Sequence, residues 1–483
     1  MLDGTARTFL AEMLIIPTGI LGAAFLARYL SPAGYGLFIL AATSIAWVEA
    51  TIGSIFSRAV VKFVSEAKDW RPVGATLLRL HLAAGIGAAV LVWLCAAIVG
   101  DAFKEPALSG YLKLFALDIP LFTLTQAHRY ILVGLGRFRQ QALSSALRWT
   151  SRLLLILLFL QLGLSITGAI LASLASSLVA FCASRLYIRP SLFRRSTFPA
   201  HVLWADGMPL SLLALSMRFF DRLDLFMLKA LGATAAEAGF YGAALNLALM
   251  PGLFALSFSP LLLSTLARVL REGDEALART ISRDALRVAL WPIPFACLTA
   301  GASEDIVRAI YGEQFKPAAP LLALLIVGAV ALAIYSVGTA ILIAAGRQRV
   351  ALLLSIPLPL VAALGHLWLI PRWGAPGAAM VTTIVSGLGA GLTVYAVFRC
   401  WRILPPLATL ARAVLTGALA FTLSAMWPAM GPLFFSLKLM MIALLIPLAL
   451  FFLNEFHAGE IALARSLMRL LLRPTARQAP REV

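Results

Sequence analysis

Long apolar runs separated by short charged segments recur along the whole chain. Each run holds about 20 residues, the length that an α-helix needs to cross the hydrocarbon core of a bilayer. The runs do not alternate between apolar and polar residues, which disfavours a β-barrel. Residues 141–186 are nearly continuous, so counts of twelve or thirteen spans stay open. The pattern predicts fourteen spans, at residues 9–30, 36–57, 76–100, 111–134, 141–162, 164–186, 208–230, 238–263, 285–301, 318–345, 350–370, 375–398, 406–427 and 432–453.

Composition supports an all-α membrane protein. Of the 483 residues, 61% are hydrophobic and 13% are charged, a proportion that a soluble domain cannot bury. The net charge of +18 would suggest nucleic acid as a partner in a soluble protein, but here the basic residues cluster in short loops between spans. Four cysteines lie in or at the ends of apolar runs without a CxxC pair, so packing is expected rather than disulfides or metal.

The loop charges predict the orientation of the chain. If the N-terminus is cytoplasmic, the inner loops and tails hold 26 basic residues and the outer loops hold four. Cytoplasmic loops of membrane proteins are enriched in Lys and Arg, so both termini are expected in the cytoplasm. The first run lacks a cleavage site and is expected to stay as a span. The tail from residue 454 is expected to form an amphipathic helix on the inner leaflet, followed by a disordered end.

An internal repeat pairs spans 1–6 with spans 7–12. LVGLGRFRQ at 132–140 matches LIAAGRQRV at 342–350 with an offset of 210, and TGAILASL at 167–174 matches PGAAMVTT at 376–383 with an offset of 209. LSPAGYG, from residue 30, also resembles AAEAGFYG, from residue 235. Because six spans is an even number, both halves have the same orientation across the membrane.

The repeat predicts two six-helix bundles related by a pseudo-two-fold axis along the membrane normal. The expected domains are an N-terminal bundle at residues 1–200, a second bundle at 201–400, two additional helices at 401–453 and a cytoplasmic tail at 454–483.

The stretch MRFFDRLDLFMLKALG at residues 217–232 places charges where the pattern predicts membrane. On a helical wheel, Asp221, Arg222 and Lys229 lie within about 60° of Arg218, and Asp224 lies roughly 120° away. A charge at the bilayer centre costs about 2.5–3.5 kcal/mol even on lenient scales. This stripe is therefore expected to face a partner or a water-filled cavity.

Spans of the first half also carry ionisable residues, among which arginine exceeds the acids. Arg148 and Arg152 are one helical turn apart and share a face. Excess arginine in a cavity favours an anionic cargo, since guanidinium binds phosphate bidentately. The candidate cargo-binding residues are Arg28, Arg129, Arg148, Arg152, Arg218 and Arg222, and the candidate cation-coupling residues are Glu49, Asp118, Asp221 and Asp224.

Structural roles are the alternatives for several of these residues. Arg28 and Lys229 lie near the outer ends of their spans and Arg129 near an inner end, where long side chains can reach the membrane surface. Arg218, Asp221 and Arg222 can instead form a purely structural ion cluster.

The chain carries no motif for hydrolytic chemistry. It has no GxxxxGK[ST] loop, no HExxH and no paired Cys/His cluster, so no cofactor and no metal are expected. The short loops leave little room for a sugar-transferring domain, and we expect a transporter rather than an enzyme.

Four stretches resemble Wzx-type polysaccharide flippases of the multidrug/oligosaccharidyl-lipid/polysaccharide exporter (MOP) superfamily. They are FLARYLSPAGYGLF at 25–38, AEAGFYGAALNLALMP at 236–251, YGEQFKPAAPLLALL at 311–325 and LIAAGRQRVALLLSIP at 342–357. The resemblance implies alternating access between two bundles around a cationic cavity. It places Arg148, Arg152, Arg218 and Arg222 in that cavity by region, and Arg28 where related flippases also use arginine.

The resemblance implies export of undecaprenyl-pyrophosphate-type lipid-linked oligosaccharides across the bacterial inner membrane. The products would be surface polysaccharides such as O-antigen, lipopolysaccharide or exopolysaccharide, and the partners would be membrane lipids and a polysaccharide polymerase complex, with no nucleic acid. A lipid II flippase and a cation-coupled multidrug exporter are the alternatives in the same superfamily, although the arginine excess argues against the exporter. A membrane-embedded glycosyltransferase or polymerase would need a larger outer loop than residues 302–317 provide.

Overall fold

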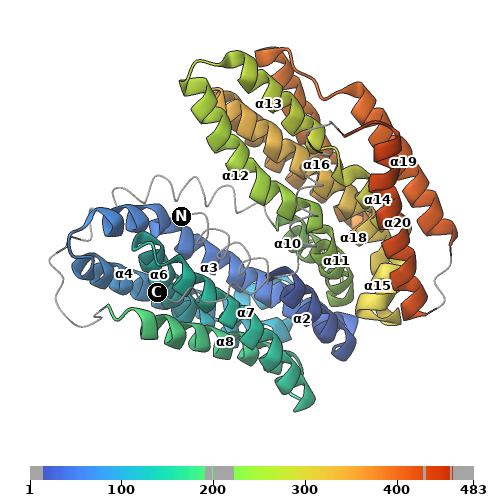
Figure 1. Cartoon of the computed structure of the whole chain (residues 1–483). Coiled ribbons are helices and arrows are strands. Elements are labelled where there is room, and N and C mark those ends of the chain that lie inside the picture. Colours follow the sequence, from blue (N-terminus) through green and yellow to red (C-terminus); the bar gives the residue numbers. More distant parts are fainter. Residues whose placement is uncertain (1–14, 191–197, 200–221, 428–430, 457–459, 461–483) are drawn as a thin grey trace, which may run out of the picture. The chain divides into compact units, whose positions relative to one another are not determined.

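Every element of the computed structural model is helical within the residues that it describes, which are 15–190, 198–199, 222–427, 431–456 and 460 (Figure 1). The first half of the chain contains α2 (Ile15–Tyr29), α3 (Pro32–Glu66), α4 (Arg71–Ala102), α5 (Pro106–Phe115), α6 (Asp118–Gly134), α7 (Phe138–Gln161) and α8 (Ser165–Tyr187). The second half contains α10 (Leu223–Ala230), α11 (Ala235–Ala248), α12 (Met250–Arg271), α13 (Glu275–Val288), α14 (Pro292–Gly301), α15 (Ser303–Tyr311), the 3₁₀ helix η1 (Glu313–Ala318), α16 (Ala319–Ala344), α17 (Gln348–Ser355) and α18 (Pro357–Trp401). The last two helices are α19 (Leu407–Met426) and α20 (Pro432–Phe452).

Each of the fourteen predicted spans overlaps helix in the described part of the chain. Nine helices there are long and apolar enough to cross a membrane, or ten if the bent pair from α13 to α15 is one span. The first and seventh predicted spans extend into residues outside the described ranges. Residues 141–186 form two helices, α7 and α8, which removes the alternative of one merged span.

Helix α18 is a hairpin that contains the eleventh and twelfth predicted spans. Gly374 has φ 57° and ψ −134°, a left-handed conformation that reverses the chain. Residues before Gly374 contact residues at a similar distance after it. A β-carbon built on Gly365 would lie 2.9 Å from Val381 Cγ1, and one built on Gly377 would lie 2.6 Å from the carbonyl oxygen of Leu369. The segments on either side of Gly374 therefore run antiparallel.

The two halves of the sequence repeat share one turn geometry. Two residues after the end of α6 lies Gly136 at φ 69°, and two residues after the end of α16 lies Gly346 at φ 72°. In each turn the amide of the following arginine donates to a carbonyl five residues back, from Arg137 to Leu132 at 2.8 Å and from Arg347 to Leu342 at 2.9 Å. This is the Schellman cap, which satisfies carbonyls that a helix end leaves unpaired. The matching sequence motifs thus encode matching helix ends.

The chain divides into two compact units. Unit 1 comprises Met1–Leu249, Ile306–Leu325 and Ser355–Val385, and unit 2 comprises Met250–Asp305, Ile326–Leu354 and Ser386–Val483. Both units contain parts of α16 and α18. The expected division into domains at 1–200, 201–400, 401–453 and 454–483 stays a prediction.

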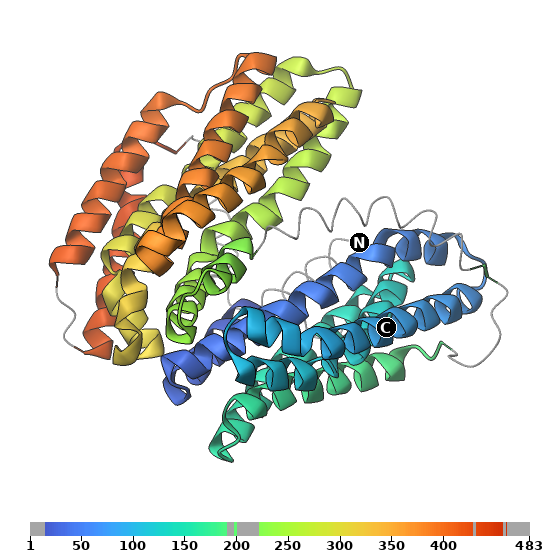
Figure 2. The same ribbon diagram turned by 180° about the vertical axis from the view of Figure 1, so that it is seen from behind.

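Unit 1 contains helices α2 to α8, which pack against one another. In both views they form one bundle, coloured blue to green (Figures 1 and 2). One buried apolar cluster joins α3, α4 and α6 and includes Val60, Leu77 and Ile131. This cluster positions the inward faces of α3 and α6, which carry Glu49 and Asp118.

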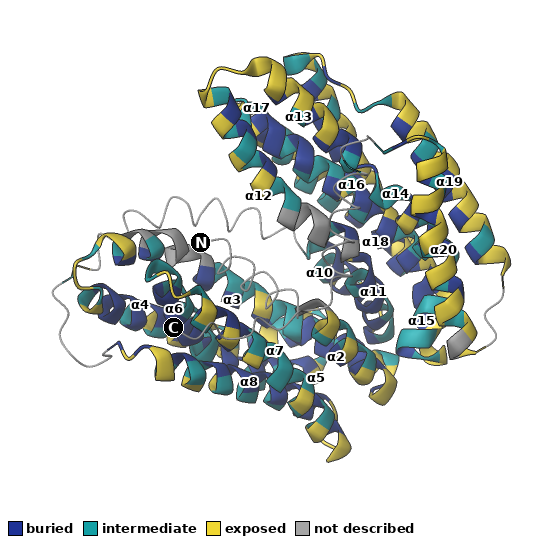
Figure 3. Cartoon of the chain, in the orientation of Figure 1, coloured by how far each residue is buried: buried dark blue, intermediate teal, exposed yellow. Residues whose placement is uncertain are grey.

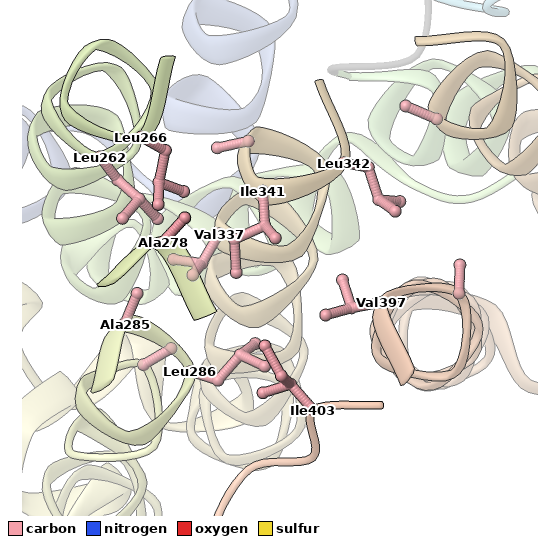
Figure 4. Packing of buried hydrophobic residues seen from close by; sticks show 14 of the residues in the cluster. Leu262, Leu266, Ala278, Ala285, Leu286, Val337, Ile341, Leu342, Val397 and Ile403 are labelled. Atoms are coloured by element: carbon pink, nitrogen blue, oxygen red, sulfur yellow. The ribbon is translucent and has the colours of Figure 1, made fainter. Parts of the chain in front are cut away.

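Unit 2 is built on a core between α12, α13, α16 and the end of α18. Leu266, Leu286, Ile341 and Val397 meet there (Figure 4). The additional helices α19 and α20 pack on α14 through a second cluster that includes Leu298, Ala420 and Ile446. Large apolar side chains are exposed along α19 and α20 (Figure 3), as expected for helices that face lipid.

Candidate functional site

Four predicted site residues meet inside unit 1. Glu49 on α3, Asp118 at the first position of α6, and Arg148 and Arg152 on α7 interact electrostatically with one another. We call these residues the four-charge cluster. Glu49 and Asp118 are 7% and 2% exposed, and the two arginines are half-buried. The cluster contains two guanidinium groups and two carboxyl groups.

Neighbouring side chains hold Arg148 in place. Its guanidinium carbon lies 4.5 Å from the ring centre of Phe122 and 5.6 Å from that of Trp149, within cation–π range. Its Nη2 donates to the Ser177 hydroxyl on α8 at 3.5 Å. Helices α6, α7 and α8 therefore fix the position of this guanidinium.

Each side chain of the four-charge cluster has a buried polar atom that makes no hydrogen bond to the described residues. Within the described ranges, Glu49 Oε1, Asp118 Oδ1 and the Nε atoms of Arg148 and Arg152 are buried and make no hydrogen bond. A buried donor or acceptor without a partner costs about 1–3 kcal/mol, and more when it is charged. Donors and acceptors of opposite charge thus lie in one place with unused capacity, as expected of a site that binds a further group.

Arg28 is bound elsewhere in unit 1. Its Nε donates to the carbonyl oxygen of Ile310 at 2.9 Å, and its Nη2 donates to that of Ala309. Both carbonyls belong to the last turn of α15, where a cation is favoured by the helix dipole. Arg28 thus joins the end of α2 to the end of α15, and its role in cargo binding stays a prediction.

Two other predicted arginines, Arg129 and Arg222, are described by different neighbours. Arg129 donates from Nη1 to Oε1 of Gln126 at 2.9 Å on the same helix. Arg222 is half-buried directly before α10. Arg218 and Asp221 lie outside the described residues, so the charged stripe predicted around Arg218 stays a prediction.

Asp224 lies in a separate and satisfied polar group on α10. Its Oδ2 accepts a hydrogen bond of 2.6 Å from the Tyr241 hydroxyl and one of 3.4 Å from Thr382, and its Oδ1 accepts one of 2.8 Å from the amide of Leu225. Three donors from α10, α11 and α18 hold this carboxyl group. Its role in cation coupling stays a prediction.

Sequence reasoning missed the partner of Lys229. This side chain is 4% exposed, and its Nζ lies 2.8 Å from Oε1 of Glu105 and donates to the carbonyl oxygen of Ala233 at 2.8 Å. It is therefore paired inside the protein and does not reach towards the membrane surface. Glu105 is 124 residues away in sequence, so no local pattern signals this pair.

Sequence reasoning also missed a buried ionic network in unit 2. Glu455, directly after α20, lies 3.4 Å from Arg287 and 2.9 Å from Arg412, and it accepts a hydrogen bond of 2.9 Å from Thr409. Arg287 also pairs with Glu460 at 2.6 Å. We call Arg287, Thr409, Arg412, Glu455 and Glu460 the Glu455 network. It fixes the start of the segment predicted as a tail onto α13 and α19.

A third missed pair lies on the last helix. Lys438 of α20 is 1% exposed, and its Nζ lies 2.7 Å from Oδ2 of Asp305 on α15. The additional helices are therefore attached to the segment from α13 to α15 by buried ion pairs as well as by apolar contacts.

Solved structures similar to this chain are membrane transporters. An inward closed structure of the lipid II flippase MurJ has 17% sequence identity, covers 94% of this chain and 99% of its own, and has a TM-score of 0.76. An inward-facing multidrug resistance MATE transporter has 15% identity, coverage of 87% and 99%, and a TM-score of 0.65. A MOP-superfamily transporter from Pyrococcus furiosus has 14% identity, coverage of 86% and 94%, and a TM-score of 0.58. At these identities the likeness shows the fold, which is that of MOP-superfamily transporters.

Sequence comparison points to a narrower group. Comparison with curated proteins gives no match. One family, described as polysaccharide biosynthesis protein, matches residues 25–320, which include the whole four-charge cluster and more than half of the chain. The chain therefore belongs to the polysaccharide biosynthesis protein family, on an all-helical membrane transporter fold.

Proposed function

We propose that this protein is a flippase that moves polyprenyl-pyrophosphate-linked oligosaccharides across the bacterial inner membrane by alternating access. The observation that carries the proposal is the four-charge cluster, in which Arg148 and Arg152 keep buried Nε donors without partners in the described structure. Membership in the polysaccharide biosynthesis protein family supports a glycan cargo, and the fold supports transport rather than catalysis.

Guanidinium donors suit the pyrophosphate head of such a cargo. Arg presents planar N–H groups that match phosphate oxygens, and these contacts are strong where water is excluded. Phe122 and Trp149 hold Arg148 by ring contacts and leave its Nε available. In this proposal the two arginines bind the phosphates of the cargo.

Two acids of the four-charge cluster affect the proposed binding of the phosphates. Glu49 and Asp118 interact electrostatically with Arg148 and Arg152, so acidic groups share the site with the guanidinium groups. An anionic cargo then carries its own charge across the membrane, and its export gains about 2.3 kcal/mol per charge per 100 mV of potential. The two acids are the proposed binding point for a coupling cation, which would reduce their repulsion of the phosphates.

Export of lipid II is the second candidate function. The similar structure of MurJ, a lipid II flippase, covers 94% of this chain. Expression of this chain in cells depleted of MurJ separates the two candidates. Rescue of growth would support lipid II, and rescue of surface polysaccharide alone in the host's own deletion strain would support the first proposal.

Substitution of the arginines tests the proposed site. We expect Arg148→Ala and Arg152→Ala each to lower surface polysaccharide at least tenfold in a deletion strain and to accumulate lipid-linked precursor, while Arg→Lys restores part of the export. The matched control is Arg139→Ala, because Arg139 is an exposed residue of the same helix. Export at the wild-type level in the double alanine variant would exclude these residues as the cargo site. Loss of the precursor itself would instead indicate a biosynthetic enzyme.

A further inference from the structure

Helices α3 and α11 cross within unit 1 at contact distances that only glycine permits. A β-carbon built on Gly36 would collide with the carbonyl oxygen of Ala235, and one built on Gly239 would collide with that of Pro32. The two backbones meet without intervening side chains. Close approach of this kind is typical of small residues spaced four apart on membrane helices. We call Pro32, Gly36, Ala235 and Gly239 the glycine crossing.

The glycine crossing is symmetric about a local two-fold axis. Gly36 and Gly239 are separated by 203 residues, and so are Pro32 and Ala235. The helix starts are also equivalent. The side chains of Ser31 and Thr234, again 203 residues apart, cap α3 and α11 by accepting from the amides of Gly34 and Glu237, both at 3.2 Å. The crossing therefore joins the equivalent starts of α3 and α11, one from each half of the sequence repeat.

Other contacts between the two repeats surround the glycine crossing in unit 1. The Tyr35 ring packs edge-on against Phe315 with ring centres 5.4 Å apart, and the Tyr35 hydroxyl accepts from Asn246 at 3.3 Å. Gln314 donates to the carbonyl oxygen of Ala27 at 2.9 Å. The loop charges predict that the starts of α3 and α11 lie at the outer membrane face. These contacts would thus close the outer end.

We propose that the glycine crossing is the outer gate of the transporter and that α3 and α11 separate there when cargo leaves. This inference rests on the proposed transport function. Repeats related by an axis along the membrane normal alternate access by rocking against each other, which requires a contact that forms and breaks. A backbone contact with no interlocking side chains can separate without rotamer rearrangement. The alternative is a permanent fulcrum that stays closed throughout transport.

An engineered disulfide distinguishes the gate from the fulcrum. Ile39 Cβ lies 3.5 Å from the position of a β-carbon on Gly242, one turn beyond the crossing, which is within the range of about 3.5–4.5 Å for disulfides. The variant carries Ile39→Cys and Gly242→Cys in a background in which Cys95, Cys182, Cys297 and Cys400 are serine. Free thiols are counted by a maleimide gel shift, and surface polysaccharide is measured after oxidation and again after reduction.

The gate predicts that oxidation of the pair lowers export at least tenfold and that reduction restores it, while each single cysteine variant is insensitive. Undiminished export by the oxidised pair would overturn the gate, as would failure of the folded pair to cross-link. If the wild-type gene does not restore polysaccharide to the deletion strain, the transport proposal fails instead.

A glycine substitution gives a second and independent measurement. Gly36→Ala should prevent closure, so that in the folded protein a cysteine at Ala238, which is 0% exposed, reacts with an impermeant maleimide from outside at least fivefold faster. The matched control is Gly87→Ala, where a β-carbon meets nothing within 4 Å. Equal labelling of the two folded variants, or failure of Gly36→Ala to fold at all, would favour the fulcrum.

Discussion

The Glu455 network and the four-charge cluster are both groups of buried charge, and they differ in their ion pairs. In the network, Glu455 contacts Arg287, Arg412 and Thr409 at 2.9–3.4 Å. In the cluster, each of the four side chains has a buried nitrogen or oxygen atom that makes no hydrogen bond in the described structure. Close ion pairs indicate a structural role, since removing one partner leaves a buried charge. Buried polar atoms without a hydrogen bond indicate a site that a further molecule completes.

The largest expected effect is on the paired network. Glu455→Ala should lower the free energy of unfolding by about 3 kcal/mol, because Arg287 is 4% exposed and would lose a buried counter-charge. The measurement is the melting temperature and folded yield in detergent. The matched control is Glu275→Ala on the exposed pair with Arg279, which should cost less than about 1 kcal/mol. Equal melting temperatures for both variants would remove the structural role of the network.

A smaller effect is expected at the pair between Glu105 and Lys229. Glu105→Gln should destabilise the protein by about 2 kcal/mol, because it leaves the 4% exposed lysine without a counter-ion. Lys229→Met should cost less, since Glu105 is 24% exposed and can be hydrated. The double variant should recover much of the loss of Glu105→Gln in the same melting experiment. Purely additive losses would mean that the two side chains do not interact.

The smallest effect on stability is expected inside the four-charge cluster. Glu49→Gln should change the free energy of unfolding by less than about 1 kcal/mol, because Glu49 Oε1 has no partner to lose in the described structure. It should tighten the binding of inorganic pyrophosphate severalfold by removing a like charge, measured as a larger ligand-induced rise in melting temperature. A loss of stability as large as that of Glu455→Ala would place Glu49 among the structural charges.

The helices of this fold were predictable because each depends on a local property of the sequence. Span length and apolar content predicted helices that overlap every expected position, and the matching motifs at 132–140 and 342–350 contain equivalent turns at Gly136 and Gly346. Helical spacing also predicted that Arg148 and Arg152 share a face. These inferences need only neighbouring residues.

The pairing of charges was not predictable because it depends on contacts between distant segments. Lys229 and Glu105 are 124 residues apart, and Arg287 and Glu460 are 173 apart. Counting charges along the first half predicted an arginine excess, which stays a prediction, but it did not predict that Glu49 and Asp118 interact with Arg148 and Arg152. Composition gives the number of charges, but only the packing of α3, α6 and α7 determines which of them balance.

The reversal within α18 has a practical consequence for labelling this protein. Only Gly374 departs from helical geometry there, and a β-carbon on it would lie 2.8 Å from Oε1 of Glu237, which caps α11. An epitope tag or protease site inserted at this joint would displace the cap as well as the hairpin. The junction between α12 and α13 is a better position for such an insertion, placed between Glu272 and Gly273, because both residues are exposed and a β-carbon on Gly273 meets nothing within 4 Å.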